Sequence, residues 1–293
     1  MTTFSRSSDS AAADAPVALV AALIPALRPH EFRRLRALLY GSCGIRLRQG
    51  KEELVRSRLG RRVMDAGTPS FGAYLDAVER DVAAGRYAEL GTLVDALTTN
   101  QTAFFREPAH FEYMRDVLLP ALAAGTRPVR VWSAGCSTGE EPFTLAVLLR
   151  EHLPADRYAG ARILATDVSS RVLEKARAAT YSARALTAVP ALLRRRMFDA
   201  RPNGDRFVVR ADLRAIVRFA RLNLMREWPL RGPFDAIFCR NVMIYFDAPV
   251  RQRLIERFWA LLAPGGHLFV GHSESLGAMT HGLRYVQPAV YVR

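Results

Sequence analysis

The sequence predicts an α/β protein in which a doubly wound, mostly parallel sheet with a small antiparallel insertion follows an all-helical domain. From Pro128 onward, short apolar runs alternate with helical segments, which is the sequence form of a parallel sheet covered by helices on both faces. From about Arg28 to Leu97, apolar residues instead recur at helical spacing. A chain of 293 residues, 50% of them hydrophobic, is long enough for two domains of ordinary size.

The chain begins with a Ser- and Ala-rich head over residues 1–25, which we expect to be mostly disordered. A helical domain is predicted over residues 26–97. Within it, Phe32, Leu35 and Leu39 stand at positions i, i+3 and i+7, which indicates a helix with one buried face.

A second helix is predicted from Lys51 to about Met64, and it carries two stripes. At about 100° per residue, Val55, Leu59 and Val63 share one arc, which predicts a core face. The adjoining arc is basic, and the run contains little acid to pair with it. Its cations are Lys51, Arg58, Arg61 and Arg62. A solvated arginine face and a docking surface explain this stripe about equally well.

We expect a linker helix over residues 98–127 and a second domain over residues 128–293, whose helices begin after Glu140, Ser170 and Ala248. The predicted strands of its sheet are the apolar runs 129–132, 163–166, 234–238 and 267–270, with a last antiparallel strand over 289–292.

The antiparallel insertion is predicted at about residues 198–220. The turn Pro202-Asn203-Gly204-Asp205 is a hairpin signal, and the runs 206–209 and 216–219 are its expected strands.

The composition restricts partners and compartment. The net charge is 42 − 28 = +14, which favours an acidic partner, either nucleic acid or a carboxylate-rich protein surface. Three cysteines without a C-x-x-C pair indicate neither a disulfide framework nor a structural metal, and we expect a reducing cytoplasm. The apolar stretch 11–27 contains Asp14, Pro16 and Pro25, so it is a poor membrane span.

The segment 131–145, V-W-S-A-G-C-S-T-G-E-E-P-F-T-L, predicts a nucleotide-type cofactor cradle. An apolar strand breaks into a turn with Gly135 and Gly139 and then into a helix, and Asp167 closes the next strand, where it can bind ribose hydroxyls. The two glutamates after the turn stand where a pyrophosphate would need positive charge. S-adenosylmethionine, which has no phosphate and carries a cationic sulfonium, fits better, so the cradle favours methyl transfer.

Two further segments carry polar residues that could bind a ligand. In T-T-N-Q-T-A-F-F-R-E-P, Asn100 as a helix cap and Arg106 as a surface residue are the plain structural interpretations. In F-D-A-I-F-C-R-N-V-M-I-Y-F, a buried strand runs into Arg240 and Asn241, and ligands bind at the carboxyl ends of parallel strands. An ordinary loop is the alternative there.

At these residues the sequence resembles the chemotaxis-receptor glutamate methyltransferases, the CheR family. The resemblance covers about residues 28–293 and rests on six blocks in the order of the family. They read V-R-S-R-L-G-R-R, T-T-N-Q-T-A-F-F-R-E, W-S-A-G-C-S-T-G-E-E-P-F, A-T-D-V-S-S-R-V-L-E-K-A-R, F-D-A-I-F-C-R-N-V-M-I-Y-F-D and P-G-G-H-L-F-V-G-H-S-E-S.

The resemblance implies a Rossmann-like methyltransferase domain that uses S-adenosylmethionine and releases S-adenosylhomocysteine, without a metal. The implied reaction is O-methylation of glutamate side chains on chemoreceptors (methyl-accepting chemotaxis proteins), which gives glutamate 5-O-methyl esters for sensory adaptation. The implied partners are the cytoplasmic methylation helices of these receptors, docked by the helical domain. Nucleic-acid binding and membrane insertion are not implied.

The resemblance also implies roles for the residues before and within the glycine turn. Asn100, Thr102 and Arg106 would contact the cofactor, with Arg106 as a partner for its methionine carboxylate. Glu141 would face the cofactor beside the tight turn at Gly135.

By the same match, Asp167 would hold the ribose, Asn223 and Leu224 would flank the adenine, and Arg240 with Asn241 would close the site.

Arg106 and Tyr245 are the pair that the family places nearest the reacting groups. A glutamate side chain has a reference pKa of ~4.3, so it arrives as an ionised nucleophile and needs no general base. Tyr245 would donate a hydrogen bond that aims the carboxylate. The loop Arg201–Asp205 looks shorter than in members that bind a receptor tail peptide, which argues against such a tether.

Two other functions are compatible with parts of the sequence. A nucleic-acid methyltransferase suits the charge of +14, but residues 240–245 read R-N-V-M-I-Y where amino-methylating members of that class carry N-P-P-Y or D-P-P-Y. A non-catalytic signalling scaffold that binds S-adenosylmethionine is the other, and the presence of Arg106, Asp167, Asn241 and Tyr245 argues against it.

Overall fold

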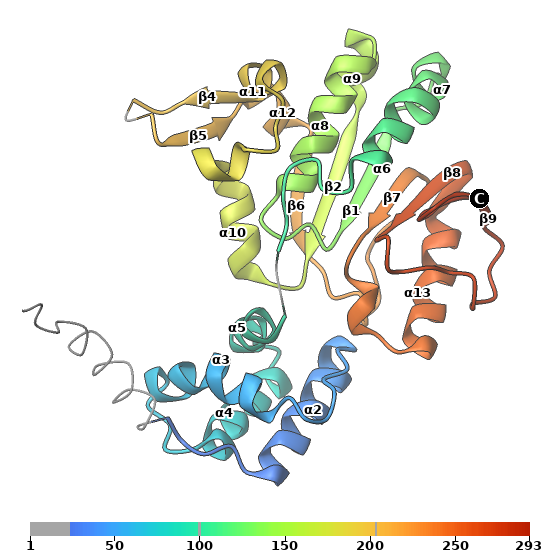
Figure 1. Cartoon of the computed structure of the whole chain (residues 1–293). Helices are drawn as coiled ribbons and strands as arrows, with labels where there is room; N and C mark the ends of the chain where they lie inside the picture. The colour runs from blue at the N-terminus through green and yellow to red at the C-terminus, as the bar shows by residue number, and fades with distance from the viewer. Residues whose placement is uncertain (1–23, 99–100, 203) are drawn as a thin grey trace, which may run out of the picture. The chain divides into compact units, whose positions relative to one another are not determined.

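The computed structural model describes residues 24–98, 101–202 and 204–293 (Figure 1), so nearly all of the predicted head lies outside the described residues. The chain divides into two compact units. The first comprises the described residues up to Leu38 together with Leu47–Leu97, and the second comprises Leu39–Arg46 and the described residues from Thr98 to Arg293. Among the described residues, no helix is long and apolar enough to cross a membrane.

The first unit is built from helices, as the sequence predicted. They are α2 (Pro29–Cys43), whose residues from Leu39 on are counted with the second unit, α3 (Glu52–Asp65), α4 (Phe71–Ala83) and α5 (Ala88–Leu97). Val55, Leu59 and Val63 of α3 are buried, which confirms the predicted core stripe. Tyr74 and Val78 of α4 and Leu93 of α5 are buried as well, so α3, α4 and α5 share an apolar core.

The second unit contains a seven-stranded sheet in the order β6-β2-β1-β7-β8-β10-β9. The strands are β1 (Arg130–Ala134), β2 (Arg162–Asp167), β6 (Val217–Arg221), β7 (Phe234–Cys239), β8 (Leu262–Val270), β9 (Arg284–Gln287) and β10 (Val290–Val292). The pairs from β6 to β8 are parallel, and β10 runs antiparallel to β8, which confirms the predicted last strand.

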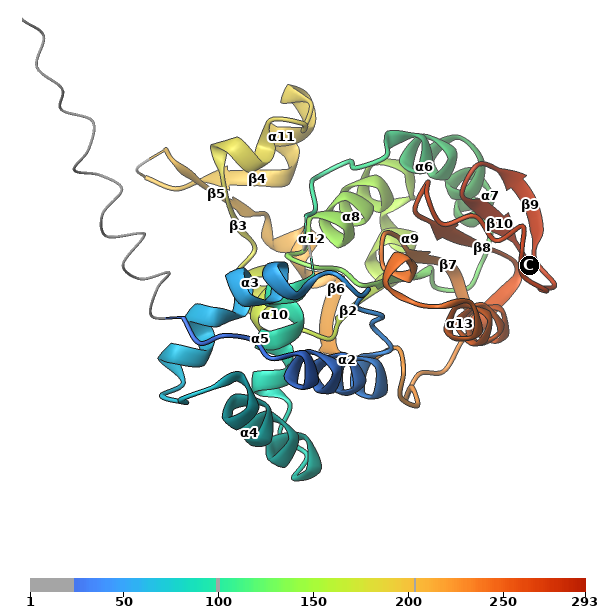
Figure 2. The same ribbon diagram turned by 60° about the horizontal axis from the view of Figure 1, so that its bottom comes forward.

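Helices cover both faces of this sheet, so the doubly wound prediction is confirmed (Figure 2). Alternate residues of β1 enter separate cores: Val131 packs with α6 (Pro108–Tyr113), α7 (Leu119–Ala124) and α8 (Glu140–His152), whereas Trp132 packs with α13 (Ala248–Leu261). The other helical segments are η1 (Met114–Leu118), α9 (Ala155–Gly160), α10 (Ser170–Ala178), η2 (Ala183–Leu186), α11 (Ala191–Met197), α12 (Ala211–Ala215) and η3 (Met243–Tyr245).

The small antiparallel sheet has the order β3-β5-β4, with β3 (Thr180–Ser182), β4 (Phe198–Ala200) and β5 (Arg206–Val209). The predicted hairpin turn joins β4 to β5, although Asn203 within it lies outside the described residues.

The assignment of residues 216–219 to this insertion was wrong. That run forms β6, which pairs in parallel with β2 in the large sheet. β6 is an edge strand in which only Val217 is buried, so it lacks the continuous apolar run that marks the central parallel strands.

Candidate active site

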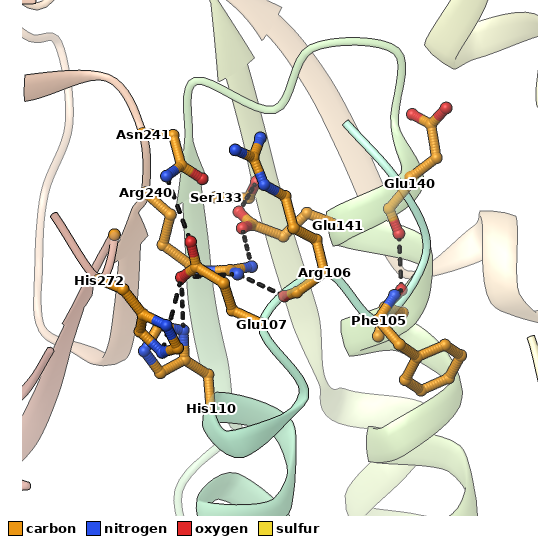
Figure 3. A network of polar contacts seen from close by, with 12 residues as sticks. Phe105, Arg106, Glu107, His110, Ser133, Glu140, Glu141, Arg240, Asn241 and His272 are labelled. Carbon is orange, nitrogen blue, oxygen red and sulfur yellow. Dashed lines mark hydrogen bonds and ion pairs between the residues drawn. The ribbon is translucent and has the colours of Figure 1, made fainter. Parts of the chain in front are cut away.

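Polar residues gather where β1, β2 and β7 end, at the edge where open α/β sheets bind ligands. The segment before α6 reaches the same edge, because Phe105 N donates a hydrogen bond to Thr144 Oγ1 of α8 at 3.3 Å. Figure 3 shows this segment beside the residues that follow β7.

The glycine turn after β1 depends on both of its glycines. Gly135 and Gly139 have φ of +90° and +97°, a region that favours glycine. A Cβ at Gly135 would lie 2.3 Å from Val242 Cγ2, and one at Gly139 would lie 2.8 Å from Tyr181 Oη. Gly135 N also donates to Thr166 O at 2.8 Å, which ties the turn to β2. Both the backbone and the available space thus require glycine.

Asp167, the last residue of β2, is held against this turn. Its Oδ2 accepts a hydrogen bond from Ser137 N at 2.9 Å, and its Oδ1 accepts one from Ser169 N at 3.0 Å. The half-buried carboxylate is therefore oriented by backbone groups from both sides. This is the position that the sequence predicted for a ribose ligand, and the role itself stays a prediction.

Arg240 is the centre of the ion pairs at this edge (Figure 3). Its side chain is only 3% exposed, and its guanidinium lies 2.9 Å from Glu141 Oε2 and 3.1 Å from Glu107 Oε2. It also donates to the carbonyl of Arg106. Glu141 in turn accepts a hydrogen bond from Ser133 Oγ at 2.7 Å. Arg240 thus joins α8 to the segment before α6.

Glu107, His110 and His272 lie around Arg240, and sequence reasoning did not single them out. Burial alone would raise the pKa of Glu107, but the charge of Arg240 with hydrogen bonds from Asn241 and Arg240 outweighs burial and lowers it. Burial, reinforced by the charge of Arg240, lowers the pKa of His110 to about 4, so this fully buried imidazole is neutral at pH 7.

These three residues also have the composition of a metal site, since ligand atoms from each lie within 4.8 Å of one another. However, the atom that they share is Glu107 Oε2, 3.5 Å from His110 Nδ1 and 4.0 Å from His272 Nε2. The guanidinium of Arg240 already contacts this oxygen at 3.1 Å. We therefore interpret the group as an ion-pair network in which Arg240 supplies the positive charge.

The predicted cofactor residues of the segment before α6 are only partly described. Asn100 lies outside the described residues, and Thr102 is half-buried. Arg106 donates from Nη1 to Gln101 O at 2.5 Å, and Figure 3 shows its side chain extending away from the ion pairs around its own carbonyl. Phe105 and Glu107, on either side, have φ of +55° and +58°, so Arg106 is presented by a strained backbone.

The remaining predicted residues follow β6 and β7. Asn223 lies just past β6, where its Oδ1 accepts from Met225 N at 2.9 Å and its Nδ2 donates to Ser42 O at 2.6 Å, while Leu224 is buried. Asn241 Nδ2 donates to Glu107 Oε1 at 3.2 Å. Tyr245 ends the short helix η3, and its side chain is half-buried. Their contacts with a cofactor or substrate stay predictions.

The basic stripe of α3, in the first unit, differs in part from the prediction. Arg62 forms an ion pair with Glu89 of α5, so the expectation that little acid pairs with the stripe was wrong for this residue. Lys51, Arg58 and Arg61 are exposed, and Arg61 lies 4.0 Å from Asp65. We call these three residues the docking cations.

Comparison with known proteins identifies the family. Residues 30–98 match the family model of the CheR methyltransferase all-alpha domain, and residues 100–292 match that of the CheR methyltransferase SAM binding domain. Similar proteins include chemotaxis protein methyltransferase 2 of Pseudomonas aeruginosa (42% identity, covering 89% of this chain and 92% of the relative) and the chemotaxis protein methyltransferase of Escherichia coli (41% identity, covering 85% and 86%). That of Borreliella burgdorferi is 37% identical, covering 89% and 93%. The chain therefore belongs to the CheR methyltransferase family, as its six sequence blocks predicted, and is a methyltransferase that binds S-adenosylmethionine.

Proposed function

We propose that this protein transfers the methyl group of S-adenosylmethionine to glutamate side chains of chemoreceptors, giving glutamate 5-O-methyl esters for sensory adaptation. The names of its relatives, chemotaxis protein methyltransferases, support the choice of substrate. The observation that carries the proposal is the acidic cradle at the glycine turn. Asp167 is fixed by Ser137 N, and Glu141 lies in the first turn of α8, which follows the same glycine turn.

This donor set fits the cofactor chemically. Glu141 of α8 already pairs with Arg240, and Asp167 puts a carboxylate at the glycine turn, so the cradle does not offer the positive charge that the pyrophosphate of a dinucleotide needs. The same carboxylates suit a ligand whose sulfonium is positive and whose ribose offers hydroxyl donors. When bound, S-adenosylmethionine supplies an electrophilic methyl group on that sulfonium.

The residues of the chain bind and orient in this proposal, and none of them has to accept a proton. The substrate carboxylate is ionised at neutral pH, and the neighbouring charge of the sulfonium favours its attack in a site that excludes water. Tyr245 donates a hydrogen bond that aims this carboxylate, and Arg106 pairs with the methionine carboxylate. Asp167 holds the ribose. Asn241 closes the site, and Arg240 fixes the backbone of Arg106.

The other predicted residues bind the cofactor or dock the receptor. Asn100 and Thr102 contact the cofactor, and Asn223 and Leu224 flank the adenine. The docking cations of α3 receive the methylation helices of the receptor. The reaction uses no metal and takes place in the cytoplasm.

Mass spectrometry of chemoreceptors co-expressed with this protein tests the proposal. We expect an added methyl group on glutamate residues of the receptor's cytoplasmic helices, and treatment with base should remove it because an ester hydrolyses. Receptors without this modification, or methyl groups found in DNA instead, would contradict the proposal.

A further inference from the structure

Glu274 is a buried carboxylate in the loop after β8, and backbone N–H groups donate hydrogen bonds to both of its oxygens. It is 2% exposed. Its Oε2 accepts hydrogen bonds from Gly271 N at 2.6 Å and Asn241 N at 2.7 Å, and its Oε1 accepts one from Ile244 N at 2.9 Å. Two of these donors belong to the loop after β7, so one side chain holds the backbone on both sides of Val242 and Met243.

The held backbone is unusual at Asn241. This residue has φ of +59°, in the left-handed region that few residues with a side chain adopt and that asparagine adopts more readily than most. The surroundings here are tight. A Cβ at Gly271 would lie 2.7 Å from Glu274 Oε2 and 2.9 Å from Asn241 N, so the loop after β7 packs directly against the bare Cα of this glycine.

The loop that Glu274 holds carries the residues nearest the proposed chemistry. Asn241 begins it and Tyr245 ends it, one residue after Ile244. Without Glu274, the partly buried N–H groups of Asn241 and Ile244 would lose their acceptor, and an N–H that is kept from water without a partner costs enough free energy to drive a rearrangement of the backbone. Any such rearrangement moves the hydroxyl of Tyr245.

We propose that Glu274 is a positioning residue for methyl transfer, which holds the loop Asn241–Tyr245 in the geometry that aims the substrate carboxylate. This inference rests on the proposed function. Glu274 touches neither reactant in the proposal and acts through Asn241 and Tyr245. Because a displacement of about 1 Å can cost roughly 100-fold in rate, small shifts of this loop matter.

Glu274→Gln tests the inference with little change in volume. The amide keeps one acceptor oxygen, but its NH₂ group must face a backbone N–H that needs an acceptor. Asp235→Asn is the matched control. Asp235 is also 2% exposed, lies on β7 at the opposite end from Arg240, and accepts from Arg130 N at 2.8 Å. Burial raises the pKa of both carboxyls, so the two variants remove comparable groups.

We expect Glu274→Gln to lower kcat for receptor methylation by roughly 10- to 100-fold, with a smaller change in S-adenosylhomocysteine affinity. Asp235→Asn should leave kcat unchanged. In a double-mutant cycle, adding Glu274→Gln to Tyr245→Phe should cost less than it does alone, because both act through the same hydroxyl. Equal kcat values for Glu274→Gln and Asp235→Asn, or full additivity with Tyr245→Phe, would overturn the inference.

Hydrogen exchange separates this inference from the proposed function. In Glu274→Gln, but not in Asp235→Asn, the amides of Asn241 and Ile244 should exchange faster, as read by mass spectrometry on the peptide 240–246. Unchanged exchange there would refute a positioning role even if turnover fell. If the wild-type protein methylated no receptor, the proposed function would fail, while the exchange data would still decide whether Glu274 holds the loop.

Discussion

Replacing Arg240 with methionine removes the charge at the centre of the site while keeping an unbranched apolar side chain in place of the stem of the arginine. The guanidinium is 3% exposed and contacts Glu141 at 2.9 Å and Glu107 at 3.1 Å. Its loss leaves two largely buried carboxylates without their counter-charge and the carbonyl of Arg106 without this donor, although Ser133 and Asn241 still donate to the carboxylates. Breaking a buried ion pair by removing one partner costs about 3–5 kcal/mol. We therefore expect Arg240→Met to lower the free energy of unfolding by that amount.

Urea denaturation at pH 7 measures this loss, and Arg127→Met is the control. Arg127 also pairs with a buried carboxylate, that of Asp235, but its side chain is 47% exposed, so water can replace much of what it contributes. The control should lose only about 1 kcal/mol. Equal losses in the two variants would show that the Arg240 network has no special stability and would refute the reasoning.

Tyr245→Phe should slow turnover and nearly keep affinity for S-adenosylhomocysteine, whereas Asp167→Ala should mainly weaken affinity; equal loss of binding in calorimetric titrations would refute this division. His110 is neutral in the folded protein because its pKa is lowered from 6.5 to about 4, so the unfolded chain binds more protons between these values. Stability should therefore be complete above pH 6.5 and fall by up to about 3 kcal/mol as the pH drops toward 4. His110→Phe should reduce this change of the free energy of unfolding with pH, as measured in urea titrations at several pH values. An unchanged pH dependence in the variant would mean that groups other than His110 cause it. Changing the three docking cations to glutamate should abolish receptor methylation and preserve cofactor binding, and unchanged methylation would remove α3 from the proposed docking surface.

Local patterns were enough to predict most of the framework. The glycine turn could be predicted because a strand, two glycines and a helix follow one another within one segment. The central parallel strands β1 and β7 were visible as mostly apolar runs, since both are covered on both faces. The core stripe of α3 was visible because Val55, Leu59 and Val63 lie at helical spacing.

What could not be predicted depends on pairing between distant segments. Residues 216–219 read Ile-Val-Arg-Phe whether their neighbour is a hairpin partner or β2, and only the fold selects β2. The ion pair between Arg62 and Glu89 joins two helices, so the acid that neutralises α3 is invisible within α3 itself.

The ion-pair network at the candidate site also joins residues that are far apart in the sequence. Arg240 and Glu107 are 133 positions apart (240 − 107), and the sequence contained no signal that they would meet. The short block G-H-S-E was noted only as part of a family pattern. In the fold, Gly271 has no side chain and lets the loop after β7 approach, and Glu274 accepts hydrogen bonds from the backbone of that loop.

Titration of the purified protein with S-adenosylhomocysteine, followed by calorimetry, tests the central claim most directly. The acidic cradle formed by the glycine turn and Asp167 should bind this product with saturable, one-to-one stoichiometry. A protein that is folded by circular dichroism and yet releases no heat of binding at any temperature would contradict the claim.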